Sequence, residues 1–175
     1  MGSVIEPVNI TGKKSNYKAY TLIALAISIS VQLLFIFNIG NAMMGNVPTF
    51  SDVVETTVFL VIWLVYGVVM GYKREEGFIK FVSIYWALTG LMSITSALMA
   101  PIGKWAIIVI PVEMLNFAPT YGLDYFTHVN VFQTLYGIIH VIPSWLSGLI
   151  GFLLGYLLKK IKFGMIIPPP KPFEK

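Results

Sequence analysis

The sequence of 175 residues contains no cysteine. Disulfide bonds, thiolate chemistry and cysteine-ligated metal sites are therefore excluded, and the redox state of the compartment cannot be inferred. Charged residues are also scarce, because they make up 11% of the chain, whereas soluble domains have about 25%. Hydrophobic residues account for 57%. This balance indicates that most of the chain is solvated by lipid, as in a membrane protein.

The common catalytic signatures are absent as well. The sequence has no HExxH metal motif, no GxSxG nucleophile motif and no phosphate-binding P-loop. No cofactor and no metal ion is therefore expected. His128 and His140 would point about 120° apart on one helix, so they cannot share a metal ion. Each histidine is expected to be an interfacial residue satisfied by hydrogen bonds.

Four apolar runs are long enough to cross a membrane as helices, which takes about 20 residues. Short polar or charged joins separate the first three, of which "GYKREEGFIK" is the most highly charged, and the longer segment at residues 100–130 precedes the last. The runs predict helices at residues 19–39, 53–72, 78–99 and 131–158. The fold class predicted is an all-α membrane protein with four transmembrane helices in a bundle.

The basic residues predict the orientation of these helices. With four spans, eleven of the twelve lysines and arginines fall on one side, and only Lys104 falls on the other. The positive-inside rule makes the lysine-rich side cytoplasmic. We therefore expect a multi-pass protein of the plasma (inner) membrane with both termini cytoplasmic. Its organisation would be an N-terminal segment (1–18), a transmembrane domain (19–158) and a basic, proline-rich tail (159–175).

The start of the second run carries a helix-capping pattern. Asp52 is followed three residues later by Glu55, a spacing in which each side chain accepts a backbone N–H at the helix start. Asn130 and Gln133 repeat this spacing before the last run. The pattern assigns both carboxylates a structural role rather than a catalytic one.

The stretch "KWAIIVIPVEMLNFAP" (residues 104–119) begins like a membrane span, but a proline and polar residues interrupt it before it is long enough to cross the membrane. As a helix, residues 105–118 would reach only about 21 Å, which is short of a hydrocarbon core of about 30 Å. Glu113, Asn116 and Thr120 would then share one helical face. The segment is therefore predicted to be interfacial or re-entrant, on the outer side of the bundle.

Small residues four apart predict close helix packing in two of the runs. This spacing lets helix backbones approach one another where lipid removes the usual hydrophobic force. Contact within the bundle is preferred to a homodimer face. The residues concerned are Gly67, Gly71, Ser144, Ser147, Gly148, Gly151 and Gly155.

Three functions remain open from the sequence. The preferred one is a non-catalytic accessory or interaction subunit, or a binder of an apolar ligand. Its partners would be the lipid bilayer and another membrane protein or a second copy, with no nucleic acid, because the basic residues flank apolar runs rather than forming a stripe among aromatics. A small oligomeric carrier is the first alternative, although Gln32, the deepest strongly polar residue, is not ionisable. An interfacial enzyme using Glu113, Asp124 and His128 is the second.

Overall fold

The computed structural model describes residues 17–35, 38, 46–99, 118–127 and 133–164. Every element in this part of the chain is helical. The predicted all-α bundle is confirmed. The described helices are α1 (Tyr17–Leu34), α3 (Phe50–Tyr72), α4 (Gly77–Met99), the 3-10 helix η2 (Ala118–Leu123), the one-turn α6 (Asp124–Thr127) and α7 (Gln133–Gly164).

Three of these helices are long and apolar enough to cross a membrane. The apolar windows are Tyr17–Leu34 in α1, Phe50–Tyr72 in α3 and His140–Lys162 in α7. Helix α4 has 23 residues, and Gly77–Met92 forms a further, shorter apolar stretch within it. The described residues therefore form a helical membrane bundle.

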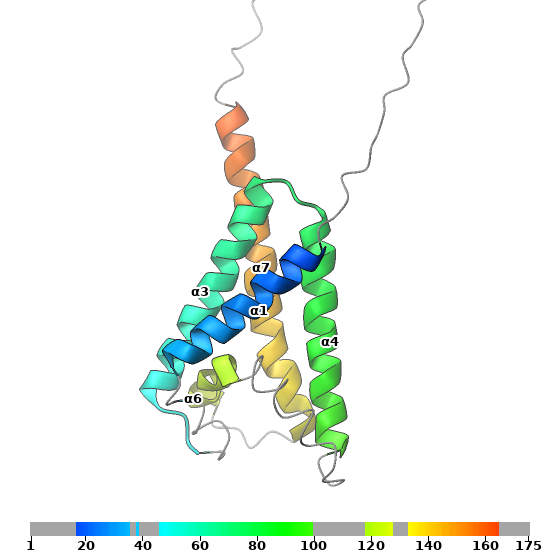
Figure 1. Cartoon of the computed structure of the whole chain (residues 1–175). Helices are drawn as coiled ribbons and strands as arrows, with labels where there is room; N and C mark the ends of the chain where they lie inside the picture. The colour runs from blue at the N-terminus through cyan, green and yellow to red at the C-terminus, as the bar shows by residue number, and fades with distance from the viewer. Residues whose placement is uncertain (1–16, 36–37, 39–45, 100–117, 128–132, 165–175) are drawn as a thin grey trace, which may run out of the picture.

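The long helices bring several distant segments to one end of the bundle, which we name the basic end. Helices α3, α4 and α7 run along the bundle, and α1 crosses them obliquely (Figure 1). The Nζ atom of Lys159 lies 5.9 Å from the ring of Tyr72, and the Tyr20 hydroxyl donates to Glu75 Oε2 at 3.1 Å. The start of α1, the α3–α4 turn and the end of α7 therefore meet here. The lysines and arginines in the described part of the chain all belong to these segments or to the first turn of α4: Lys18, Lys73, Arg74, Lys80, Lys159, Lys160 and Lys162.

Glycines bring α3 and α7 into backbone contact. A Cβ atom added to Gly67 or Gly71 would overlap backbone carbonyls of α7. In the same way, a Cβ atom on Gly151 or Gly155 would overlap backbone carbonyls of α3. Such close approach increases dispersion contacts between helices in lipid. These four glycines therefore face the partner helix inside the bundle.

The other small residues of α7 make contacts of different kinds. The Ser147 hydroxyl donates to the Leu60 carbonyl of α3 at 2.5 Å, which adds an interhelical hydrogen bond. The Ser144 hydroxyl donates to the carbonyl of His140 within α7 at 3.1 Å. Gly148 faces side chains of both α3 and α4. Helix α7 therefore uses this face to contact two neighbouring helices.

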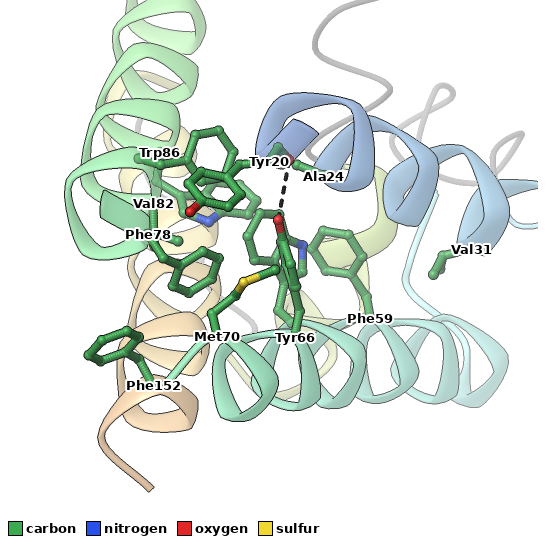
Figure 2. Close-up of a cluster of buried hydrophobic side chains, with 12 residues drawn as sticks. Tyr20, Ala24, Val31, Phe59, Tyr66, Met70, Phe78, Val82, Trp86 and Phe152 are labelled. Atoms are coloured by element: carbon green, nitrogen blue, oxygen red, sulfur yellow. Dashed lines mark hydrogen bonds between the residues drawn. The ribbon is translucent and has the colours of Figure 1, made fainter. Parts of the chain in front are cut away.

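Aromatic side chains fill the middle of the bundle (Figure 2). Phe59 and Trp63 of α3 and Trp86 of α4 are fully buried. The ring centroids of Trp63 and Trp86 are 5.2 Å apart, and those of Phe59 and Trp86 are 6.3 Å apart. Aromatic pairs in such geometry contribute about 0.5–1.5 kcal/mol each beyond their burial. The Tyr66 hydroxyl donates to the Tyr20 carbonyl at 3.5 Å and so joins α1 to this core.

Candidate functional site

Polar side chains, most of them buried, gather at the end of the bundle opposite the basic end, where η2 and α6 cover the start of α3 (Figure 1). We name this the polar end. Its side chains come from α3, η2, α6 and α7, together with Asn38 from the segment after α1. They are Asn38, Ser51, Asp52, Glu55, Thr56, Thr120, Tyr121, Asp124 and His140.

The start of α3 differs from the prediction. The helix begins at Phe50 with Thr49 as its N-cap, and Asp52 Oδ2 accepts hydrogen bonds from the Thr49 N–H and hydroxyl, both at 2.6 Å. The capping pair is therefore Thr49 and Asp52, three residues earlier than the predicted pair. The prediction of a capping role for Glu55 was wrong, because Asp52 occupies the third helical position and Glu55 the sixth.

Glu55 lies inside the bundle, and only 2% of its surface is exposed. Its carboxylate accepts a hydrogen bond from the Asn38 amide, but Oε1 has no hydrogen-bond partner among the described residues. Asn38 also exchanges hydrogen bonds with the Ser51 hydroxyl at 3.1 and 3.2 Å. The capping pattern in the sequence assigned Glu55 to the helix start and so gave no sign of this site.

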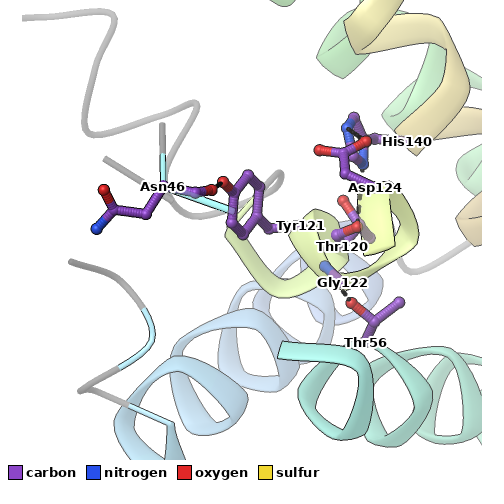
Figure 3. A network of polar contacts seen from close by, with 7 residues as sticks. All are labelled: Asn46, Thr56, Thr120, Tyr121, Gly122, Asp124 and His140. Atoms are coloured by element: carbon purple, nitrogen blue, oxygen red, sulfur yellow. Dashed lines mark hydrogen bonds and ion pairs between the residues drawn. The ribbon is translucent and has the colours of Figure 1, made fainter. Parts of the chain in front are cut away.

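The 3-10 helix η2 packs directly on the first turns of α3. The Gly122 N–H donates to the Thr56 hydroxyl at 3.0 Å (Figure 3). A Cβ atom on Gly122 would overlap the backbone of Asp52, so only glycine permits this approach. The Tyr121 hydroxyl donates to the Asn46 carbonyl, and burial raises the pKa of Tyr121. These contacts hold η2 over the polar end.

Asp124 and His140 meet between α6 and α7 (Figure 3). His140 Nδ1 lies 3.1 Å from the Thr120 carbonyl, and its Nε2 lies 3.7 Å from Asp124 Oδ1. A carbonyl only accepts, so Nδ1 carries a proton and a neutral imidazole presents Nε2 to Asp124 as an acceptor. Two hydrogen-bond acceptors, His140 Nε2 and Asp124 Oδ1, then face each other. This arrangement favours the binding of one proton, on either the imidazole or the carboxylate. Burial raises the pKa of Asp124 to about 6.

The three residues of the predicted enzyme site have different outcomes. Glu113 and His128 lie outside the described residues, as do residues 105–117 of the predicted interfacial segment. Asp124 is described, and it contacts His140. This pairing joins residues that the sequence analysis had treated separately, and no motif spacing signals it.

The imidazole of His140 is oriented by a carbonyl and a carboxylate. The nearby Ser144 hydroxyl donates to the His140 carbonyl rather than to the ring. In the described part of the chain, no three metal-ligating side chains lie close enough to hold a metal ion.

The chain matches no protein-family model, no curated protein and no solved structure. Its function is therefore inferred from the placement of its residues. The two features of the structure that bear on function are the aromatic interior and the buried carboxylates of the polar end.

Proposed function

We propose that the chain is a small polytopic membrane protein of non-catalytic type that acts through lateral contact with another membrane protein or a second copy of itself. The observation that supports this role is the solid interior, in which Phe59, Trp63 and Trp86 are fully buried. A carrier needs a polar path between helices, and an apolar ligand needs a cavity. Aromatic side chains occupy the space where either would be expected, which leaves the outer faces of the helices for interaction.

Helix α4 offers one such outer face. Ile84, Leu88 and Leu91 recur at helical spacing, and each exposes more than half of its surface. Lipid alone covers such a face in an isolated bundle, whereas an interaction subunit presents part of it to a partner. The two arrangements differ in what lies within a few ångströms of these side chains.

Site-specific photocrosslinking in native membranes tests the proposal. A photoreactive amino acid at Leu88 is expected to give a discrete protein adduct of reproducible mass, and the same residue at the buried Val82 is the matched control. The exposed Val65 of α3 and Leu154 of α7 extend the test to the other faces. If every exposed position yields lipid adducts alone, the interaction role is wrong.

We also propose that the basic end faces the cytoplasm of a cell whose plasma (inner) membrane holds the protein. The gathering of all described lysines and arginines at this end supports that orientation. Both termini would then be cytoplasmic, and η2 and α6 would lie at the outer surface.

A small carrier is the second candidate, and the buried Glu55 favours it. An ionisable side chain within a membrane helix is costly and commonly marks an ion pathway. Reconstituted vesicles loaded with a pH-sensitive dye or a sodium-sensitive dye would detect such transport. Flux through the wild-type chain that is lost in Glu55→Gln would favour the carrier over the interaction subunit.

A further inference from the structure

Glu55 is a buried carboxylate in a membrane helix that helix capping does not explain. It is the sixth residue of α3, about 8 Å along the axis from the helix start. Asp52, one turn earlier, makes the capping contacts with Thr49. Glu55 therefore needs a separate explanation for how its charge is tolerated.

A buried carboxylate is tolerated when it is paired with a cation, saturated with hydrogen bonds or protonated. Glu55 is not paired with a lysine or arginine of the described chain, because these residues all lie at the opposite, basic end. Hydrogen bonding is incomplete, since Asn38 contacts the carboxylate but Oε1 has no partner among the described residues. A small cation would supply what these contacts lack.

We propose that the Glu55 carboxylate, supported by the Asn38 side chain, is a binding site for a monovalent cation, either a proton or a sodium ion. A single carboxylate lacking a charged partner matches one positive charge. The Asn38 amide donates to the carboxylate and so holds it in place, while Oε1, which has no partner among the described residues, is an oxygen ligand of the kind that hard cations prefer. This site is independent of the proposed lateral interaction, because it lies inside the bundle rather than on its outer faces.

The other ionisable groups at the polar end lie on four elements. Asp52 on α3 adds negative charge beside Glu55 and so strengthens attraction for a cation. From the elements packed over the start of α3 come Tyr121 of η2 and Asp124 of α6, and α7 contributes His140. His140 is directed at Asp124 and Thr120 rather than at Glu55, and the same measurement on an Asp124→Asn background removes the acid response of that pair.

Thermal unfolding of the purified full chain in detergent tests the site, with tryptophan fluorescence as the signal. The melting temperature is measured from acidic to alkaline pH, in sodium chloride and in N-methylglucamine chloride at equal ionic strength. We expect the wild-type chain to be stabilised by acid or, at alkaline pH, by sodium. Glu55→Gln, which is neutral and similar in shape, should lose the sodium response and the part of the acid response that comes from Glu55, whereas the part that comes from Asp124 remains. Glu76→Gln, at an exposed carboxylate of the basic end, should keep both responses.

The arms of this experiment distinguish the two cations. Stabilisation by sodium at alkaline pH that disappears in acid indicates sodium binding in competition with protons. Stabilisation by acid that Glu55→Gln reduces, with no difference between the two salts, indicates a proton alone. A Glu55→Gln variant that responds to pH and sodium as the wild-type chain does would overturn the proposal.

A second measurement uses the wild-type chain and does not depend on the folding of a variant. Dicyclohexylcarbodiimide is an apolar reagent that modifies protonated carboxyl groups in apolar surroundings, and peptide mass spectrometry locates the adduct. The expected adduct is on Glu55, increasing toward acidic pH and decreasing with sodium if sodium competes. Modification confined to exposed carboxylates such as Glu76 would contradict the proposal.

Discussion

Nε2 of His140 lies 3.7 Å from Oδ1 of Asp124, which joins the long helix α7 to the single turn of α6 (Figure 3). The other ring nitrogen donates to the Thr120 carbonyl, so one imidazole contacts both η2 and α6. His140 is almost fully buried, whereas the Asp124 side chain keeps 16% of its surface exposed. This histidine therefore attaches the covering helices of the polar end to the bundle.

Replacement of His140 by leucine should destabilise the folded chain by about 1–3 kcal/mol, because the buried Thr120 carbonyl loses its donor. His140→Asn is the matched variant, since its side-chain amide nitrogen can take the place of Nδ1. It should recover part of the loss while still lacking the contact with Asp124. Unfolding in detergent followed by tryptophan fluorescence measures both. Equal stability of the leucine variant and the wild-type chain would show that the imidazole contacts contribute nothing.

The pKa of Asp124 predicts a pH dependence with a definite sign. Burial raises this pKa from 3.8 to about 6 in the folded chain, so the folded state binds the proton more tightly than the unfolded state. The stabilisation is therefore complete below about pH 4 and is lost as the pH rises through about 6. Asp124→Asn resembles the protonated form and should flatten this part of the profile. Melting temperatures across this range provide the measurement, and an unchanged profile in Asp124→Asn would contradict the assignment.

The sequence predicted the helices well where charged residues bound an apolar run. Residues 53–72 and 78–99 correspond closely to α3 and α4, because the charged turn between them has no place in lipid. The helix predicted to run to residue 39 extends beyond α1, which ends at Leu34, and residues 36, 37 and 39 of that prediction lie outside the described residues. Asn38 already hydrogen-bonds Ser51 beside the start of α3. Tertiary contacts, which no local pattern encodes, determine this end.

The polar end was less accessible to sequence reasoning. Thr49 and Asp52 have the same three-residue spacing as Asp52 and Glu55, and spacing alone does not select between the two overlapping caps. The choice of the earlier cap makes Glu55 an interior residue. The contact of Asp124 with His140 likewise depends on how α6 and α7 pack. The interior position of Glu55 and the contact between Asp124 and His140 both depend on the three-dimensional structure. The periodicity of the sequence therefore did not indicate them, whereas burial and distances in the structure do.

The orientation of the bundle can be tested directly, because the chain contains no cysteine. Val47→Cys lies before α3 near the polar end, and Glu76→Cys lies in the α3–α4 turn at the basic end; both positions are exposed. An impermeant maleimide should label the first variant in intact cells and the second only after permeabilisation, because lysine-rich ends remain cytoplasmic. Labelling of Glu76→Cys in intact cells, with Val47→Cys protected, would reverse the orientation.

The contact between α3 and α7 gives the last prediction. Gly151→Ala places a methyl group against the backbone of α3 at Leu64, and a backbone cannot move aside as a flexible side chain can. We expect a loss of about 1–3 kcal/mol, since overpacking forces the two helices apart. Gly90→Ala is the matched control, because its added methyl group would meet only the Val141 side chain at ordinary contact distances of 3.5 and 3.8 Å. Unfolding in detergent should separate the two variants clearly. Equal stability of both would mean that α3 and α7 do not pack through Gly151 in the folded protein.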